Sequence, residues 1–496
     1  MGDIRPRWEW RSFGDRYPAA EARFAALQPS GVQDSDEIYL LNGDGDNVKV
    51  RDALMDIKVL KQVDPHGLEQ WIPVMKGSFP LPASQVEAVL SALRLPVPAP
   101  LRPGYSLAEF LAELAAPGGV RAVRVHKHRV RYTVGGCMAE LTDVVADGHT
   151  ARTVAVEAED PAAVLATVRE LGLRDYQNVS YPRGLAALVA GAAARYAVID
   201  VGTNSVKFHL AERLAGGGWT TLVDRADVTR LGEGLGTEGR IAPAAIERTA
   251  AAIRGMADEA RRAGARAIAA VGTAGLRMAP NRAEALAAFE AASGLGVEVI
   301  SGEEESRLAY VATVEGLGVG GEPIVVFDTG GGSTQFTFGH GPRVDERYSL
   351  DVGAVRYTER FGLDRAVSPE VLREALAAIG RDLSSLDGRP SPRALVGMGG
   401  AITNITAVRH GLATYDPAVV QGTLLELSEV DRQIELYRTR DADARRSIVG
   451  LQPKRAEVIL AGACIVRTVM EKLGQRAVTV SDRGLRHGVL AERFGG

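Results

Sequence analysis

Two stretches of the chain decide the fold: "AVIDVGTNSVKFHLAE" (residues 197–212) and "IVVFDTGGGSTQFTFG" (residues 324–339). In each, an apolar run ends in an aspartate, Asp200 or Asp328, and glycine and hydroxyl residues follow at once. Such a run indicates a buried strand, and the glycine indicates the turn after it. The two stretches therefore predict two strand-turn-strand hairpins of one design, in two related halves of the chain.

Both hairpins have the composition of a phosphate cradle. Glycine lets backbone amides approach phosphate oxygens, serine and threonine hydroxyls add donors, and the aspartate can hold Mg²⁺ through water. Facing one another across a cleft, the hairpins would clamp a polyphosphate from both sides. The alternative for either stretch alone is a Gly-rich hairpin without a ligand, because single glycine motifs are weak signals. The residues expected to bind phosphate are Gly202, Thr203, Asn204, Ser205, Lys207, Gly330, Gly331, Gly332, Ser333 and Thr334.

Short apolar runs continue on both sides of the hairpins. Examples are "AIAAVGTAG" (residues 267–275), "VEVISG" (residues 297–302) and "ALVGMGG" (residues 394–400), and Ala-rich helical segments separate them. This alternation predicts βαβ units and a mostly parallel sheet, which is an α/β fold, from Tyr196 onward.

Length and composition set the broad class. With 496 residues the chain is too long for one ordinary core, which predicts two or three domains. The net charge of −4 gives no overall attraction to DNA, RNA or an anionic membrane, so any polyanion site must be local. Two cysteines, Cys137 and Cys464, and a charged N-terminus predict reduced thiols, no signal peptide and a cytoplasmic protein.

Further segments, in a fixed order, make the chain from Tyr196 onward similar to the exopolyphosphatase/guanosine pentaphosphate phosphatase family. These segments are "RLGEGLG" (230–236), "GTAGLRMAPN" (272–281), "ISGEEESRLAY" (300–310), "SLDVGAVRYTERF" (349–361), "GMGGAITNI" (397–405) and "SDRGLRHGVL" (481–490). The resemblance implies an actin-like, ribonuclease H-like fold of two duplicated α/β domains, residues 196–315 and 316–496, with a cleft between them. It also implies a homodimer and a final helix that can return to the first of these domains.

The resemblance implies roles for single residues. Glu305 of "ISGEEESRL" corresponds to the glutamate that the family uses as general base on the attacking water, with Glu304 beside it. Neighbouring carboxylates push the pKa of a carboxylate upward, which makes it a better base near neutrality. Arg277 corresponds to an arginine that contacts the phosphate near the scissile bond. The resemblance further implies Mg²⁺, or alternatively Mn²⁺, held by Asp200, Asp328 and Glu305, and a catalytic role for Asp328.

From the residues alone, other interpretations stay open. Three successive glutamates also fit an acidic helix start, and Arg277 also fits a surface arginine. Where the resembled family usually has a glutamate after its glycine turn, this chain has Gln335, which lacks the charge and would weaken Mg²⁺ binding.

A further glycine turn follows the stretch at residues 394–400. Its glycines are Gly397, Gly399 and Gly400, and Asn404 comes soon after, in the helix expected behind the turn. The resemblance places this turn where other proteins of the fold hold a nucleoside.

Residues 1–190 have a different pattern, short alternating runs that predict an α+β, antiparallel barrel-like domain. Lys49 with Arg51, and Arg129 with Arg131, alternate along strands, so each pair would face one side, and with Lys58 line a barrel interior. The alternative is a solvated basic strand face.

This region loosely resembles the CYTH-type triphosphate tunnel domain, which implies that these inward cations bind a phosphate chain. Of that family's metal-holding Glu-x-Glu-x-Lys strand, "RWEWRSF" offers Glu9 and Arg11 only. We therefore expect the tunnel to bind phosphate chains without hydrolysing them well.

The leading interpretation of the whole chain is a Mg²⁺-dependent enzyme that removes the terminal phosphate of inorganic polyphosphate or the 5′-γ-phosphate of guanosine pentaphosphate. A second class is a non-catalytic binding protein or sensor, in which Gln335 marks lost chemistry. A third is a kinase of the same fold, although no acceptor-substrate motif is evident.

Overall fold

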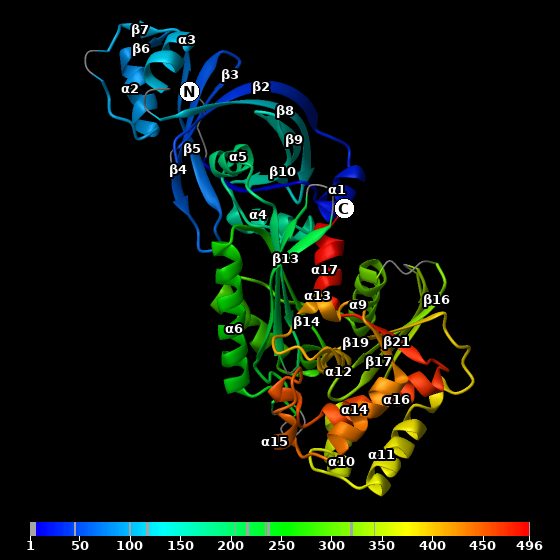
Figure 1. Ribbon diagram of the computed structural model, residues 1–496. Helices are drawn as coiled ribbons and strands as arrows, with labels where there is room; N and C mark the ends of the chain where they lie inside the picture. Colours follow the sequence, from blue (N-terminus) through cyan, green and yellow to red (C-terminus); the bar gives the residue numbers. More distant parts are fainter. Residues whose placement is uncertain are drawn as a thin grey trace. The chain divides into compact units, whose positions relative to one another are not determined.

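The structure is a computed structural model that describes residues 6–43, 46–98, 101–115, 119–203, 205–214, 218–233, 235, 239–317, 321–341 and 343–495. The chain divides into two compact units, both drawn in Figure 1. The first unit contains residues 1–270, 279–298 and 493–496, and the second contains residues 271–278 and 299–492.

A closed, eight-stranded antiparallel barrel forms the N-terminal part of the first unit (Figure 1). In spatial order its strands are β1 (Arg7–Gly14), β10 (His149–Ala158), β9 (Cys137–Ala146), β8 (Arg121–Val134), β2 (Gly31–Leu41), β3 (Asn47–Arg51), β4 (Leu54–Val63) and β5 (Glu69–Ser78), which pairs with β1 again. The predicted antiparallel barrel is thus confirmed.

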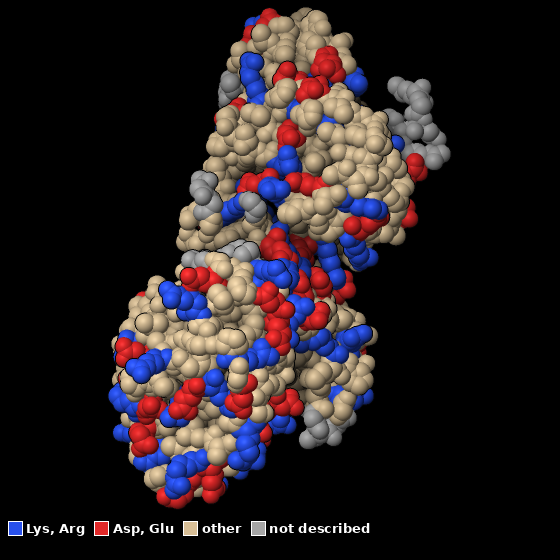
Figure 2. All heavy atoms as spheres, turned by 90° about the vertical axis from the view of Figure 1, so that its right-hand side faces the viewer, with Lys and Arg blue, Asp and Glu red and all other residues tan. Residues whose placement is uncertain are grey.

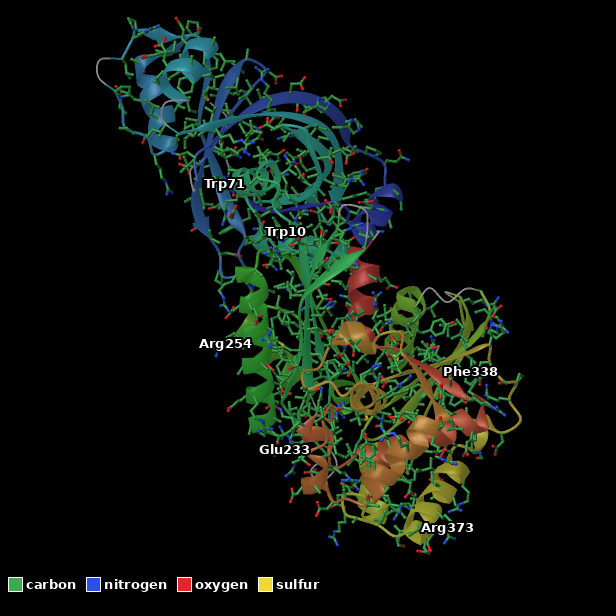
Figure 3. All side chains as sticks on the ribbon, in the orientation of Figure 1. Trp10, Trp71, Glu233, Arg254, Phe338 and Arg373 are labelled. Carbon is green, nitrogen blue, oxygen red and sulfur yellow. The ribbon has the colours of Figure 1, made fainter. Side chains whose placement is uncertain are left out.

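Strand β1 inverts the usual burial pattern. Its charged residues Glu9 and Arg11 alternate with Trp10, and the register with β10 puts Glu9 and Arg11 on the inner face. Trp10, labelled in Figure 3, points outward but is buried, because helix α4 (Pro161–Glu170) packs against β1. Asp160 caps α4, and its side chain accepts a hydrogen bond from the Ala162 amide at 2.9 Å.

Helix α5 (Tyr181–Val189) fills one part of the barrel interior. It packs against β1, β2, β9 and β10, and its Tyr181 and Leu185 meet inward-facing residues such as Tyr39 and Val125 in one apolar cluster. One part of the interior is therefore filled by α5, and the remainder is lined by charged side chains. The other elements are α1 (Pro18–Ala25), α2 (Ala83–Ala92), α3 (Leu107–Phe110), a π-helical turn (Leu111–Ala115) and the small β6–β7 pair (Leu81–Pro82, Gly104–Tyr105).

The rest of the first unit is built on a five-stranded sheet. Its strand order is β13 (Trp219–Val228), β12 (Ser205–Arg213), β11 (Arg195–Val201), β14 (Ala265–Gly272) and β15 (Glu298–Val299), with helices α6 (Pro243–Arg262) and α8 (Arg282–Ser293). The end of helix α17 (Leu485–Phe494) belongs here: Phe494 stacks on Tyr196 with ring centroids 5.0 Å apart, and Arg493 pairs with Asp175.

The second unit contains a six-stranded sheet in the order β18 (Arg343–Leu350), β17 (Thr334–His340), β16 (Pro323–Thr329), β19 (Ala394–Met398), β21 (Ala477–Val480) and β20 (Leu424–Glu426). Read along the chain, both sheets begin with the order third, second, first, fourth strand. This repeated order confirms the predicted duplicated, actin-like α/β architecture.

The expectation of a mostly parallel sheet was wrong. In the second sheet β16 runs parallel to β19 and β19 to β21, but β16–β17, β17–β18 and β20–β21 are antiparallel. The physical reason is that the hairpin strands β17 and β18 join the sheet beside the parallel strands, and β20 adds a further antiparallel pair at the other edge.

Helices cover both faces of the second sheet. On one face α9 (Gly302–Leu317) packs through Tyr310 and Val314 on Val326 and Val396. On the other, the almost fully buried α16 (Ile459–Lys472) contacts α10 (Ala354–Phe361), α11 (Pro369–Asp382), α12 (Gly400–His410) and α14 (Leu427–Arg438). Phe338, labelled in Figure 3, lies on β17. Short helices α7 (Ala274–Met278), α13 (Pro417–Val420) and α15 (Ala442–Arg445) complete the unit.

Two further observations concern the surface and the thiols. Acidic and basic side chains intermingle over the face shown in Figure 2. Cys137 and Cys464 are free and buried, in β9 and α16. Among the described residues, no helix is both long enough and apolar enough to span a bilayer.

Candidate active site

The first hairpin joins β11 to β12 in the first unit. Asp200 is buried near the end of β11, and Lys207, its register partner on β12, places Nζ 3.0 Å from Asp200 Oδ2. The Gly202 amide donates to the Ser205 carbonyl at 3.1 Å and closes the turn. Thr203 is exposed at the tip, and its carbonyl accepts from the Gly232 amide at 2.8 Å. Asn204 lies outside the described residues.

The second hairpin, in the second unit, repeats this construction. Asp328 lies near the end of β16, and the Gly330 amide donates to the Ser333 carbonyl at 2.9 Å. In both hairpins the glycine comes two residues after the aspartate and the serine five residues after it. The carbonyls of Gly330 and Gly331 accept from the first amides of α10, which fixes the glycine turn against that helix.

The Asp328 carboxylate faces a third glycine turn. Gly399 adopts φ +91°, and a Cβ placed on it would lie 2.2 Å from Asp328 Oδ1. Only glycine therefore fits at this position, both for its backbone conformation and for the approach of the carboxylate. Gly397 is equally tight, because a Cβ there would lie 2.3 Å from the Ile402 side chain.

Arg277 and Glu305 contact one another directly. Arg277 Nη1 donates to Glu305 Oε2 at 2.7 Å and to the Ile300 carbonyl at 3.0 Å. Arg277 is in α7 and Glu305 in the first turn of α9, so two segments 28 positions apart bring the two predicted residues together. Ser301 caps α9, as its Oγ accepts from the Glu304 amide at 3.0 Å.

Each of the three glutamates at the start of α9 has its own arginine. Glu303 pairs with Arg347 at 3.1 Å, Glu304 with Arg307 at 2.7 Å and Glu305 with Arg277 at 2.7 Å. Glu303 is 78% exposed and Glu305 is 33% exposed. Glu305 thus shares its helical turn with the carboxylates that the sequence led us to expect, and a guanidinium lies 2.7 Å from its own carboxylate.

The residues after the second glycine turn have local partners. Gln335 Nε2 donates to Ser333 Oγ at 2.8 Å, so the Ser333 hydroxyl keeps its own proton for another acceptor. Thr334 is fully buried and its hydroxyl donates to the Val352 carbonyl at 2.6 Å. We therefore expect Thr334 to hold the hairpin in place, and not to contact phosphate as its position in the sequence had suggested.

Arg455 is a candidate that the sequence did not reveal. It lies against the glycine turn, since a Cβ on Gly400 would be 2.4 Å from Arg455 Nη2. Burial lowers the pKa of the Arg455 guanidinium, and the nearby charge of Asp328 raises it. The buried Asn404 positions the preceding residues, because its Oδ1 accepts from the Gln452 amide at 2.9 Å. "LQPKRAEV" carries no motif, so only the fold could show this arginine.

In the barrel, the register places all five predicted cations on the inner face. Lys49 and Arg51 lie opposite Tyr39 and Glu37, Lys58 lies opposite Asn47 on the same face, and Arg129 and Arg131 lie opposite Gln33 and Gly31. Lys49 and Arg129 are buried, so these two residues do not belong to a solvated basic face, which was the alternative interpretation. Arg131 lies nearer an opening, exposed and bonded to Gln33.

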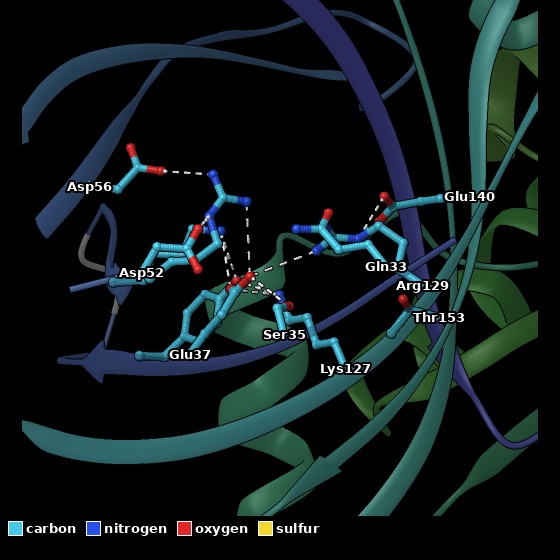
Figure 4. A network of polar contacts seen from close by, with 12 residues as sticks. Gln33, Ser35, Glu37, Asp52, Asp56, Lys127, Arg129, Glu140 and Thr153 are labelled. Carbon is cyan, nitrogen blue, oxygen red and sulfur yellow. Dashed lines mark hydrogen bonds and ion pairs between the residues drawn. The ribbon is translucent and has the colours of Figure 1, made fainter. Parts of the chain in front are cut away.

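The same inner face carries residues that the sequence reading missed. Lys127, Glu37 and Glu140 are inward-facing, and Figure 4 shows them joined with Arg129 in a network of polar contacts. Alternation with Arg129 would have predicted Lys127, but an inward glutamate among cations has no separate sequence signal.

The two sheets share one strand order, and in each of them a strand that ends near an aspartate leads through a glycine turn into a hairpin. This repeated arrangement defines an actin-like protein. The chain belongs to the Ppx/GppA phosphatase family, whose profile matches residues 210–495. The barrel lies outside this matched range.

Known proteins agree over the same part of the chain. Exopolyphosphatase 2 of Mycobacterium tuberculosis (strain H37Rv) is 32% identical over 329 residues, which are 60% of this chain and 98% of that protein. A crystal structure of the Aquifex aeolicus Ppx/GppA phosphatase is 31% identical with a TM-score of 0.55, covering 60% of this chain and 99% of that one. An exopolyphosphatase structure from Cytophaga hutchinsonii, 22% identical with a TM-score of 0.52 over 60% of this chain and 96% of that one, shares the fold. The chain is thus homologous to exopolyphosphatases.

Proposed function

We propose that residues 196–496 hydrolyse the terminal phosphoanhydride of inorganic polyphosphate. The observation that carries the proposal is the ion pair between Arg277 and Glu305, because it joins a candidate phosphate ligand to a candidate base. The similarity to a protein named exopolyphosphatase 2 supports polyphosphate as the substrate class. Guanosine pentaphosphate ends in the same anhydride and is the alternative substrate.

In the proposed reaction the oxygen of a water molecule attacks the terminal phosphorus. Glu305 accepts a proton from that water, the bond from phosphorus to the bridging oxygen breaks, and the shortened chain leaves with the electron pair. Arg277 turns from Glu305 to the phosphate, where it offsets the charge that develops on the oxygens. This exchange releases the carboxylate when substrate is present.

Each hairpin is proposed to hold phosphate oxygens. In the first, the Gly202 turn, Thr203, Asn204, Ser205 and Lys207 provide backbone, hydroxyl, amide and ammonium donors. In the second, Gly330, Gly331, Gly332 and the proton of the Ser333 hydroxyl do so. That the hairpins face each other remains a prediction.

The carboxylate oxygens of the site are suitable ligands for a hard cation. Asp328 presents a carboxylate oxygen to the glycine turn at Gly399, and carboxylates are the ligands that Mg²⁺ and Mn²⁺ prefer. Asp328 and Glu305, with Asp200 of the first hairpin, are the residues proposed to hold it. A bound Mg²⁺ would offset negative charge on the phosphate oxygens.

Phosphate release from long-chain polyphosphate and from guanosine pentaphosphate, measured side by side, tests the proposal. In Glu305→Gln we expect release to fall at least about 100-fold, the scale of a lost general base. The matched control is Glu303→Gln on the same helical turn, which should stay within about twofold because that glutamate is exposed and pairs with a different arginine.

The two competing classes give other results. A sensor would bind polyphosphate without releasing phosphate in the wild type or either variant. A kinase would transfer phosphate only when an acceptor is supplied. Release by the wild type that is insensitive to Glu305→Gln would remove Glu305 from the proposed role.

We also propose that the barrel binds a phosphate chain without hydrolysing it well. Support comes from the inward register of Lys49, Arg51, Lys58, Arg129 and Arg131. Cations alternating along neighbouring strands match the repeat of a polyanion, and partly buried charges are weakly screened by salt.

A further inference from the structure

Glu37 lies at the centre of the barrel's charged network (Figure 4). Its side chain is 0% exposed, and four cations surround its carboxylate. Lys127 Nζ and Lys49 Nζ lie 3.0 and 3.1 Å from Oε2, and Arg129 and Arg51 approach Oε1 at 3.8 and 3.9 Å. Ser35 Oγ also donates to Oε1, at 3.3 Å. The carboxylate therefore has the surroundings of a bound oxyanion.

The network around Glu37 contains more cations than one carboxylate can satisfy. Burial would raise the pKa of Glu37, but Lys127 and Lys49 outweigh burial and lower it far below the usual range, so the group is ionised at neutral pH. Burial and the neighbouring Lys49 lower the pKa of Lys127 despite its pairing with Glu37. Four cations thus share one ionised carboxylate.

Further acids neutralise the rest of the network. Glu140 pairs with Arg11 at 3.0 Å and with Arg129 at 3.1 Å, and Asp56 approaches Arg51 at 3.9 Å. Most inward cations thus already have an acidic partner from this chain, which leaves little charge free for another anion. Within the described part of the chain, the buried hydroxyls of Thr142 and Tyr181 have no hydrogen-bond partner, so the interior retains unused donors.

We infer that Glu37 is an internal counter-ion of the barrel. Its carboxylate occupies the position among the four cations where an anion would bind, the anion seat, and thereby limits the affinity of the barrel for phosphate chains. The inference rests on the barrel function proposed above, and it adds the residue that regulates that site. A phosphate group entering the seat must displace the Glu37 carboxylate or share its four cations. Removing the charge of Glu37 while keeping its size would leave those cations around a neutral side chain. An incoming oxyanion would then bind the cations without competing with a carboxylate.

The test is calorimetric titration of the full chain with tripolyphosphate. All proteins carry Glu305→Gln so that the ligand is not consumed, and three are compared: that background, the background with Glu37→Gln, and the background with Asp36→Asn. Asp36 is the matched control, because it is the next residue of the same strand, loses the same charge, and is 88% exposed on the outer face.

We expect Glu37→Gln to bind tripolyphosphate at least about tenfold more tightly than the other two proteins, a change of about 1.4 kcal/mol. Adding Arg129→Gln to Glu37→Gln should cancel the gain, which places the new affinity in the barrel. Affinity in Glu37→Gln within twofold of the Asp36→Asn protein would overturn the inference.

The four cations around Glu37 could prevent Glu37→Gln from folding without an anion. In that case the melting temperature is followed against tripolyphosphate concentration, and a steeper rise for Glu37→Gln than for Asp36→Asn supports the inference, because a ligand of the folded state stabilises it. Equal slopes overturn it. Neither result bears on the phosphohydrolase proposal, which is decided separately by phosphate release with and without Glu305→Gln.

Discussion

At the scale of single residues, Gln335 changes what its neighbours can do. Its amide donates to the Ser333 hydroxyl, whereas a glutamate at this position would have to accept from it. Gln335 is also the register partner of Asp328 across the hairpin, so its neutrality removes one negative charge close to a proposed metal ligand. We therefore expect the glutamine to weaken metal binding and to leave the Ser333 proton available to phosphate.

We predict that Gln335→Glu lowers the Mg²⁺ concentration at half-maximal phosphate release by about threefold to tenfold, because an added carboxylate strengthens a magnesium site. Initial rates at varied Mg²⁺ and fixed polyphosphate measure this. Gln335→Ala serves as control, since it removes the amide without adding charge. An unchanged Mg²⁺ requirement in Gln335→Glu would separate this residue from the metal.

The sequence predicted some residues of the candidate site and not others. Glu305 and Arg277 were found through resemblance, but their contact across 28 positions depends on how α7 and α9 meet. Arg455 had no motif around it, and its place beside Gly400 follows only from the way the chain after α15 returns to the glycine turn. A lone charged residue in a loop carries no spacing from which its partners can be read.

At the scale of elements, hydrophobic pattern and turn residues predicted strands well where one face is apolar. Lys49 and Arg51 lie on one strand, β3, and both glycine hairpins form as expected. Strand β1 was reached only through the resemblance of "RWEWRSF", because its charged residues point inward and its pattern is that of a surface segment. The expected mostly parallel sheet was wrong, because the βαβ pattern leaves out the antiparallel strands that the predicted hairpins themselves add to the sheet.

The turn before α12 should tolerate no side chain. We predict that Gly399→Ala lowers the free energy of unfolding by at least about 3 kcal/mol and abolishes phosphate release, because the new methyl group meets Asp328 and the backbone is strained. Denaturant unfolding and phosphate release measure the two effects.

Gly411→Ala is the control for Gly399→Ala. Gly411 also has a left-handed backbone, with φ +61°, but no atom lies within 4 Å of the added methyl group. It should therefore lose only about 1–2 kcal/mol and keep its activity. Equal losses in both variants would mean that the contact with Asp328 has no part in the effect.

At the scale of the whole molecule, the chain joins a family domain to a barrel that the family match does not include. The profile match begins at residue 210, and the relatives cover 60% of the chain. Resemblance could therefore predict the fold of the C-terminal part in detail. For the barrel, the sequence indicated closure and the inward cations, but not the acids Glu37 and Glu140 that neutralise them, because a balance of charges depends on neighbours from distant strands.

If the barrel holds part of a long substrate, its inward cations should matter for long chains alone. We predict that Arg131→Gln raises the KM for long-chain polyphosphate about threefold to tenfold and leaves the KM for tripolyphosphate unchanged. Arg124→Gln is the matched control, since Arg124 lies on the same strand, is exposed and has the outward register. Equal KM values for long chains in the two variants would contradict a role for the barrel in substrate binding.

Closure of the barrel has a consequence for self-association. Every strand of the barrel is paired on both sides, so none can accept an additional strand. At the open border of the second sheet, β18 presents Arg343, Asp345, Glu346 and Arg347, whose mixed charges discourage backbone pairing with another molecule. Neither the barrel nor β18 therefore favours association with another copy of the protein through backbone pairing of strands. Copies that meet at these two places must recognise one another through side chains.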